Sequence, residues 1–300
     1  MLTAACIWDK GLDKMKYGIS AALESLPLFQ PVTLRGDIDT VCAQAAELGY
    51  DAVELHVYQP NRYDPVKISE AAKRYGLPIC AVANGMEYTI GGLSLIDDDK
   101  SRREAAISKI LEHADFSAEL GAKLIVGIMR GNIPKGGDPA EYLARFSDAM
   151  VRICSHAAAS NIEVVLESIL RYINNYLNSV PETIDYIISL GLPNLSLHLD
   201  THSMAMEETN LSDSILYCKA KPLGYVHYSD NNRRHPGGGA LDFKALTRAL
   251  LEIGYDDYVT VECVPWPDSF ESARRGLEYM KAVENAAMLE LLNTSERDGI

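Results

Sequence analysis

Residues 181–200 have the sequence PETIDYIISLGLPNLSLHLD. In residues 181–190 the apolar side chains recur every three to four positions, which indicates an amphipathic helix. Gly191 follows, and glycine is the usual residue where a helix stops in the left-handed conformation. The short apolar run Leu195–Asp200 is typical of a buried strand. The stretch therefore predicts a helix that ends at a glycine and leads into a strand.

The same helix–glycine–strand unit recurs along the chain, with glycines at 49, 76, 121 and 254. The strands that we expect are Tyr17–Ala22, Ala52–Tyr58, Pro78–Ala83, Lys123–Met129, Glu163–Glu167, Leu195–Asp200, Tyr225–Asp230 and Tyr258–Cys263. The expected helices include Ile38–Leu48, Val66–Tyr75, Ser101–Leu120, Pro139–Ala159, Pro181–Leu190, Asp242–Ile253 and Ser269–Leu292. This alternation predicts an α/β protein, and eight strands close a (β/α)8 TIM barrel. A doubly wound open sheet is disfavoured because no G-x-G-x-x-G follows the first strand.

Length and composition limit the class of protein. The chain has 300 residues, 47% hydrophobic and 23% charged, and no Pro- or Ser-rich linker divides it. We expect one barrel domain over residues 15–300, including a C-terminal helix, behind an N-terminal extension of residues 1–14. The net charge of −14 argues against a nucleic-acid partner. Six scattered cysteines, no signal-peptide pattern and no long apolar run predict a cytoplasmic protein with no membrane association.

Polar residues at the ends of the late strands are the strongest functional signal. Glu167, Asp200, His227 and Glu262 each follow an apolar run, one on each of four successive strands. In such a barrel these ends form the site, so the four side chains should converge. Three carboxylates together repel one another, and a divalent cation relieves the repulsion. Oxygen-rich ligation with one imidazole favours Mn²⁺, with Mg²⁺ or Co²⁺ as alternatives. A helix cap or a surface ion pair is the alternative for any one of them.

Four further histidines lie near these ends or in a nearby loop. His56 ends the second expected strand and could line the pocket or simply pack there. His202 follows Asp200 and could contact substrate or pack under its loop. His235 follows two arginines in a glycine-rich loop that could hold an anionic substrate. His198 lies two residues before Asp200 and on the same face, so we interpret it as a hydrogen-bonded core histidine.

Several motifs resemble those of a known family. Residues 229–237, SDNNRRHPG, are similar to the S-x-x-N-R-x-x-P-G loop of xylose-isomerase-like barrels, in particular the ketose 3-epimerases and ketogluconate epimerases. Hydroxypyruvate isomerases and endonuclease IV type barrels are more distant relatives. The likeness runs from about residue 15 to 292 and includes residues 77–81, 92–95, 127–131 and 200–201. It implies that the four strand-end residues bind the metal and that Arg233 reaches a substrate oxygen.

The resemblance also implies a reaction. In that family two metal-bound glutamates flank the substrate carbon, one removing a proton and the other returning one to the opposite face. Glu167 and Glu262 are the matching residues, which indicates a metal-dependent epimerase or isomerase of a keto sugar or sugar acid that acts through an enediolate.

Two positions depart from the family pattern. Residues 167–173, ESILRYI, stand for E-P-x-N-R-[FY]-E, so Arg171 is retained as a candidate substrate-binding residue while Ile173 replaces a glutamate that holds the terminal hydroxyls of the sugar. The family's D-T-F-H-M is D-T-H-S-M here, which puts Ser203 at the usual histidine position and His202 one residue earlier. An apolar Ile173 suits a substrate with a less polar or bulkier substituent.

These departures leave other functions open. Proton abstraction beside a ketone also begins β-elimination, so the chain is similar to the catalytic subunits of C-glycoside deglycosidases, which act on 3-oxo-glycosides together with a small partner subunit. A non-catalytic sugar-binding barrel is a second alternative, although binding alone would not need two opposed glutamates. An endonuclease IV type phosphodiesterase is a third, disfavoured by the charge and by too few clustered histidines. We expect a homo-oligomer, with the small partner subunit as the alternative.

Overall fold

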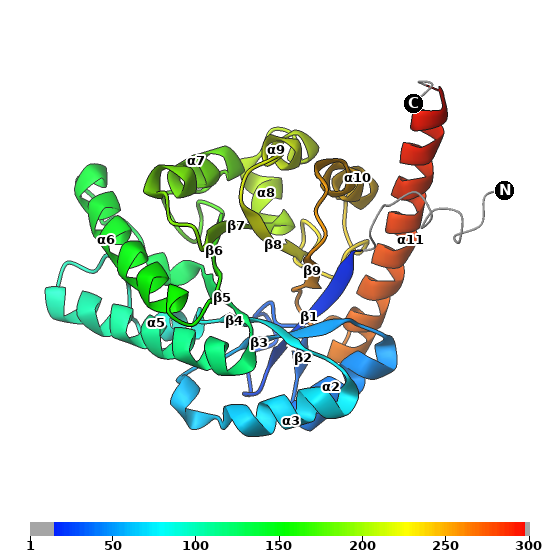
Figure 1. Cartoon of the computed structure of the whole chain (residues 1–300). Helices are drawn as coiled ribbons and strands as arrows, with labels where there is room; N and C mark the ends of the chain where they lie inside the picture. Colours follow the sequence, from blue (N-terminus) through cyan, green and yellow to red (C-terminus); the bar gives the residue numbers. More distant parts are fainter. Residues whose placement is uncertain (1–14, 298–300) are drawn as a thin grey trace.

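The structure is a closed barrel of eight parallel strands (Figure 1). The computed structural model describes residues 15–297. Strand order is β1-β3-β4-β5-β6-β7-β8-β9, and β9 pairs with β1 to close the ring. The two-residue β2 pairs with the carboxyl end of β1, beyond the part that β9 covers. The single-domain TIM barrel expected from the sequence is confirmed.

Strand and helix bounds follow the sequence expectation closely. The strands are β1 Lys16–Ala22, β2 Leu34–Arg35, β3 Ala52–His56, β4 Ile79–Ala83, β5 Lys123–Val126, β6 Val164–Glu167, β7 Leu195–Asp200, β8 Leu223–Tyr228 and β9 Tyr258–Val261. The main helices are α2 Ile38–Leu48, α3 Pro65–Tyr75, α5 Lys100–Leu120, α6 Pro139–Ala158, α7 Val180–Leu190, α10 Phe243–Ile253 and α11 Ser269–Arg297.

Shorter elements lie in the loops between these strands and helices. They are α4 Met86–Thr89, α8 Thr201–Glu207, α9 Leu211–Tyr217 and the 3₁₀ turns η1 Pro60–Arg62 and η2 Ile128–Arg130. The expected strand Lys123–Met129 is too long, because the chain turns into η2 after Gly127. The expected strand Tyr225–Asp230 is displaced and begins at Leu223 instead.

The glycines of the repeated unit act as helix stops. Gly49, Gly76, Gly121, Gly191 and Gly254 all have positive φ between 62° and 84° and end α2, α3, α5, α7 and α10. Their free amides donate to carbonyls of the last helical turn, which closes the helix before the chain enters the barrel.

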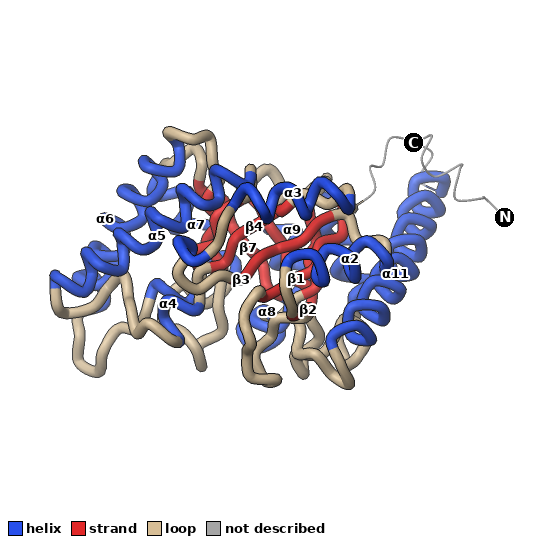
Figure 2. The backbone as a smooth tube through the Cα atoms, turned by 90° about the horizontal axis from the view of Figure 1, so that it is seen from below, coloured by secondary structure: helices blue, strands red, loops and turns tan. Residues whose placement is uncertain are grey.

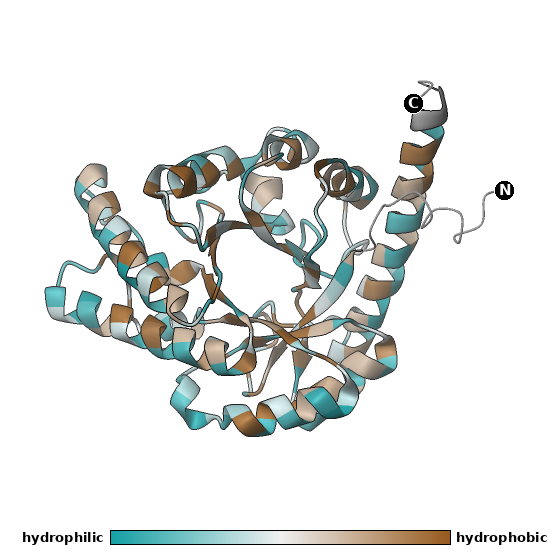
Figure 3. Cartoon of the chain, viewed as in Figure 1, coloured by the Kyte–Doolittle hydropathy of each residue, from teal (hydrophilic) through white to brown (hydrophobic). Residues whose placement is uncertain are grey.

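Helices surround the barrel, and α11 runs along the side near β1 and α2 (Figures 1 and 2). Apolar residues concentrate on the strands and on the inner faces of the helices, as Figure 3 shows. Small side chains such as Ala52, Ala81 and Ala83 form part of a second cluster with Tyr225. The core therefore lies mainly between strands and helices, and the barrel axis can hold polar side chains.

The expected extension at residues 1–14 lies outside the described residues. Among residues 15–297, no helix has both the length and the apolar character needed to cross a membrane.

Candidate active site

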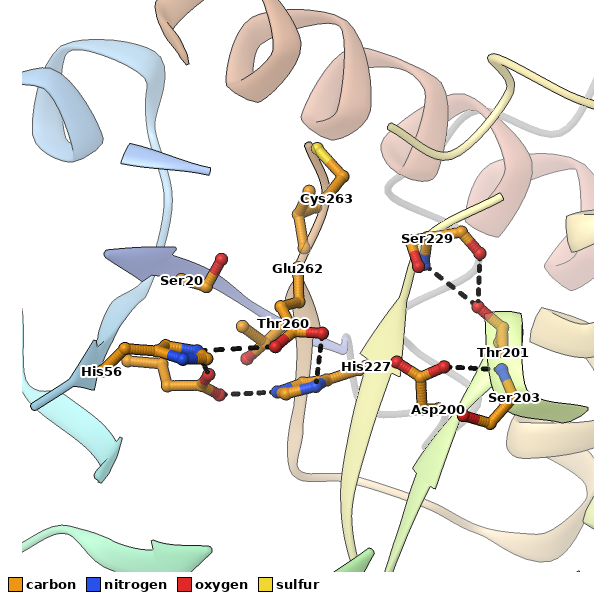
Figure 4. A network of polar contacts seen from close by, with 12 residues as sticks. Ser20, His56, Asp200, Thr201, Ser203, His227, Ser229, Thr260, Glu262 and Cys263 are labelled. Carbon is orange, nitrogen blue, oxygen red and sulfur yellow. Dashed lines mark hydrogen bonds and ion pairs between the residues drawn. The ribbon is translucent and has the colours of Figure 1, made fainter. Parts of the chain in front are cut away.

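The four strand-end residues come from adjacent strands of the barrel. Glu167 and Asp200 are the last residues of β6 and β7, His227 lies one residue before the end of β8, and Glu262 directly follows β9. The strands pair in parallel, with Asp200 opposite His227. Parallel strands bring their carboxyl ends to one edge, so these side chains share one end of the barrel. Figure 4 shows Asp200, His227 and Glu262 turned toward a common space.

Asp200 caps a helix, which the sequence analysis gave as the alternative to a metal ligand. One of its carboxylate oxygens accepts the amide of Ser203, 2.7 Å away, and so caps helix α8. The other accepts from Arg233 at 2.5 Å. The carboxylate is fully buried. Capping therefore fixes the orientation of Asp200 while its second oxygen faces the site.

Arg233 connects two of the predicted ligands. Its guanidinium donates 2.5 Å bonds to both Asp200 and Glu262, and a 2.9 Å bond to the hydroxyl of Ser229. Arg233 has a φ of 62°, which an arginine adopts only when its surroundings hold it. The loop is held by the carboxylate of Asp230, which accepts the amides of Gly237, Gly239 and Leu241. The sequence singled out this loop, and the structure places its arginine in the carboxylate cluster.

Glu54 belongs to the same polar cluster, and the sequence analysis missed it. It lies on β3, is fully buried, and accepts from Nε2 of His227 and from Nε2 of His56, each at 2.7 Å. His56 also lies 3.6 Å from Glu262, and Figure 4 shows it pointing toward His227. The signal that could have revealed Glu54 is a lone carboxylate inside a strand that is otherwise apolar up to His56.

The charges in the cluster shift the pKa values of its members in opposite directions. Burial, with the nearby charges of Asp200 and Glu262, raises the pKa of Glu167 to about 8. Burial alone would also raise the pKa values of Asp200 and Glu262, but the positive charges of Arg233 and His227 outweigh it and lower both. Burial opposes the charge of His227, yet Glu54 and Glu262 raise its pKa well above the usual value. Two cations thus offset the acidic groups.

The donor set fits a divalent cation. Nδ1 of His227 is buried, has no hydrogen-bond partner among the described residues, and lies 3.5 Å from a Glu262 oxygen. Ligand atoms of Glu54, His227 and Glu262 lie within 4.8 Å of one another, and so do those of Glu167, His198 and His227. A metal-binding histidine normally donates its other nitrogen to a carboxylate, which is the relation between His227 and Glu54.

The remaining predicted residues divide into two groups. His202, on α8, and His235, in the arginine loop, are partly and largely buried on the same side of the barrel as the strand ends. His235 makes a 2.9 Å contact with the carbonyl of Pro236. Arg171 instead lies on the surface and pairs with Glu207 at 2.6 Å. Ile173 is 45% exposed, and its carbonyl accepts from Asn132.

His198 differs from its sequence interpretation in one respect. It is fully buried in the barrel, as expected, but the expected hydrogen bonds are absent, because neither ring nitrogen has a partner among the described residues. Its ring instead meets that of His227 edge to face at 4.1 Å.

Comparison with known proteins places the chain in a family. Residues 42–283 match the model of the xylose isomerase-like TIM barrel. The chain belongs to this family. It is 34% identical over 222 residues to a ketose 3-epimerase of Arthrobacter globiformis, covering 72% of this chain and 74% of that one. It is 31% identical over 225 residues to the 3-dehydro-D-guloside 4-epimerase of Escherichia coli, covering 72% and 83%.

Solved structures agree with this membership. A D-allulose 3-epimerase from Methylomonas sp. in complex with D-allulose superposes with a TM-score of 0.77 at 25% identity, covering 90% of this chain and 97% of that one. The 3-keto-D-glucoside 4-epimerase of E. coli in its apo form gives 0.75 at 25% identity, covering 90% and 100%. These relatives are epimerases, so the chain is an enzyme of the isomerase class, as the sequence predicts. None of the relatives named here supports the lyase, binding-protein or phosphodiesterase alternatives.

Proposed function

We propose that this enzyme epimerises a keto sugar or keto glycoside at a carbon next to the ketone, with Glu262 and Glu167 as the proton-transferring residues. The observation that carries the proposal is that Glu167 and Glu262 lie at the carboxyl ends of their strands and belong to one charged cluster with Asp200 and His227. Their surroundings differ: Arg233 donates to Glu262 and lowers its pKa, whereas burial and the charges of Asp200 and Glu262 raise the pKa of Glu167. Two carboxyl groups in different surroundings are how an active site assigns a base and an acid.

The chain's own groups account for each role. Ionised Glu262 accepts the α proton, and protonated Glu167 delivers one, so the carbon passes through an enediolate and can be inverted. Glu167, Asp200, His227 and Glu262 would hold a divalent cation, and His227 would give up its Nδ1 proton on binding it. When bound, such a cation polarises the ketone and its neighbouring hydroxyl and makes the α proton more acidic. Mn²⁺ is the ion that we propose, with Mg²⁺ or Co²⁺ as alternatives.

Arg233 is the proposed contact to substrate oxygen. Its guanidinium already lies against Asp200 and Glu262, so it can donate to an oxygen held beside them. His56 and His202 remain candidates for substrate contacts, because His56 borders Glu262 and His202 follows Asp200 on α8. His235 and Arg171 stay predictions; in Arg171 the guanidinium is already paired with Glu207.

A substituted substrate is favoured over a free ketose. Ile173 replaces a group that would bind terminal hydroxyls, and its carbonyl is held by Asn132. Asn132 also lines a surface hollow of about 520 Å³, together with Tyr88 and Tyr142. The loops after β4 and β5 form this hollow at the same end of the barrel as the site. It offers room for a substituent such as the aglycone of a keto glycoside.

Solvent-deuterium incorporation tests the proposal. The Mn²⁺-loaded protein is incubated in D₂O with free ketoses, keto-acids and 3-oxo-glycosides, and deuterium at the α carbon is followed by NMR. We expect incorporation together with the inverted product, most rapidly for a 3-oxo-glycoside, and none after removal of the metal with a chelator. Incorporation into none of the substrates would contradict the proposed chemistry, and elimination of the aglycone would favour the lyase.

A further inference from the structure

His198 is a buried imidazole with no hydrogen-bond partner in the part of the chain that the structure describes. It lies on β7 two residues before Asp200, so both side chains point to the inside of the barrel. It is 0% exposed, and both Nδ1 and Nε2 lack a hydrogen-bond partner among the described residues. Leaving a buried polar atom in this state is energetically unfavourable. A group that is not part of the chain therefore belongs beside this ring.

The surroundings of His198 indicate which group that is. Ligand atoms of Glu167, His198 and His227 lie within 4.8 Å of one another. Two nitrogen or oxygen ligands on opposite sides of one ion, each about 2.1 Å from it, are about 4.2 Å apart. The three side chains are thus spaced closely enough to share a single cation with little movement.

The rings around His198 also leave it available as a ligand. Tyr225 and His227 meet its ring edge to face, with centroids 5.2 and 4.1 Å away, and neither gives it a hydrogen bond. Both ring nitrogens therefore stay without a hydrogen bond from the described residues, and a neutral imidazole nitrogen is a common metal ligand.

We propose that His198 is an additional nitrogen ligand of the divalent cation, so that the site contains two imidazoles rather than one. The inference rests on the cation site of the proposed function. Its consequence is a stronger preference against Mg²⁺, because Mg²⁺ prefers oxygen ligands whereas transition-metal ions also accept imidazole nitrogen, Co²⁺ and Zn²⁺ most strongly. The cation that this site selects is accordingly a transition-metal ion.

Counting the bound imidazoles tests this directly. Each histidine bound to Co²⁺ retains one ring N–H, whose proton signal is shifted far outside the ordinary range and disappears in D₂O. For the Co²⁺-loaded full chain we expect two such signals. His198→Leu removes both nitrogens and should leave one signal, whereas His156→Gln, which changes an exposed histidine on α6, should leave two.

Metal affinity and stability provide a second measurement. By calorimetric titration, His198→Leu should lower Co²⁺ or Zn²⁺ affinity at least tenfold and Mg²⁺ affinity less than threefold. Without metal, the variant should unfold at the same or a higher temperature, because an unpartnered buried polar group has been removed. If His198→Leu does not fold, His198→Asn is measured instead. The number of shifted N–H signals in the unsubstituted protein is a test that needs no variant.

The outcomes separate this inference from the proposed function. One signal in the unsubstituted protein, unchanged in His198→Leu, overturns the role of His198, as does an equal loss of affinity for Mg²⁺ and Co²⁺. Deuterium incorporation with only one signal contradicts this inference alone. Two signals without deuterium incorporation contradict the proposed reaction alone, and failure to bind Co²⁺ overturns the inference together with the cation site.

Discussion

The two ends of the barrel each carry a polar cluster, and the clusters differ in how completely their charged and hydrogen-bonding groups are paired. At the amino ends of the strands, Lys123 donates to Glu163 and Asp257 at 2.6 Å each and to the carbonyl of Gly224 at 2.9 Å. All three ammonium protons are used, and the carboxylates remain about one-third exposed. At the carboxyl ends, Glu54, Asp200 and Glu262 are buried. Both ring nitrogens of His198 and Nδ1 of His227 lack hydrogen-bond partners among residues 15–297.

This difference indicates that the amino-end cluster serves stability and the carboxyl-end cluster serves function. The amino-end cluster is complete without any further group, so we expect it to contribute to folding alone. The carboxyl-end cluster gathers Glu54, Glu167, Asp200 and Glu262 around the cationic side chains of Arg233 and His227, and we propose that a further cation completes this arrangement. Substitutions at one end should change the free energy of unfolding, and those at the other should change catalysis.

Glu262→Gln is expected to have the largest effect. The amide keeps the shape and can still meet Arg233, but it cannot accept a proton. We expect kcat to fall by a factor on the order of 10²–10⁴, measured as substrate turnover and as deuterium incorporation. Glu163→Gln, the matching change at the amino end, should leave kcat within about twofold. Near-normal turnover in Glu262→Gln would remove its assigned role.

Glu54→Gln should have the next largest effect, because Glu54 positions His227 rather than contacting substrate. The glutamine side chain can accept a hydrogen bond from only one of the two imidazole N–H groups, because its NH₂ group, which is itself a donor, faces the other. Second-layer carboxylates of this kind change metal affinity about 10–100-fold. We expect that loss in Mn²⁺ affinity by titration, with kcat reduced at subsaturating metal and partly restored by excess metal.

A matched control for Glu54→Gln is Glu87→Gln. Glu87 is likewise buried and accepts from a histidine, His113 at 3.2 Å, but it lies outside the cluster. The control should lose stability without losing metal affinity. Equal Mn²⁺ affinity in both variants would mean that Glu54 has only a structural role.

The features that the sequence predicted are those that depend on residues close together in the chain. A helix stop at Gly191 or Gly254 depends on the glycine and the preceding turn, and each was foreseen. The strand-end residues Asp200 and Glu262 were also foreseen, because the position of a residue in its own βα unit decides which end of the barrel it occupies.

The parts that sequence missed depend on distant contacts. Glu54 meets His227 across 173 positions of chain, so nothing near it in sequence identifies its partner. The lack of hydrogen bonds to His198 among residues 15–297 could not be predicted either, because it depends on the side chains of all the neighbouring strands. The short helix α8 was missed because Asp200 was considered as a ligand or a cap, and it caps the helix while facing the site.

Ile173→Glu should have a smaller effect, on substrate choice. A carboxylate at this half-exposed position can accept from the hydroxyls of a free sugar, so kcat/KM for small ketoses should rise severalfold to about tenfold while that for 3-oxo-glycosides falls. Ile173→Gln, which adds polarity without charge, should produce less of this change. Unchanged or poorer turnover of free ketoses would count against the assigned role of position 173.

Lys123→Met should have the smallest effect on catalysis and a clear effect on stability. Removing the ammonium leaves Glu163 and Asp257 facing each other without a cation, and Ser196, which donates to Glu163, cannot neutralise that charge. Because both carboxylates reach water, the cost is moderate, about 1–3 kcal/mol. Denaturant unfolding at pH 7 measures this loss of stability, while kcat/KM should stay within about twofold. A tenfold fall in kcat/KM with unchanged stability would contradict the division of roles between the two ends, because the Lys123 cluster would then be acting on the site through the length of the strands.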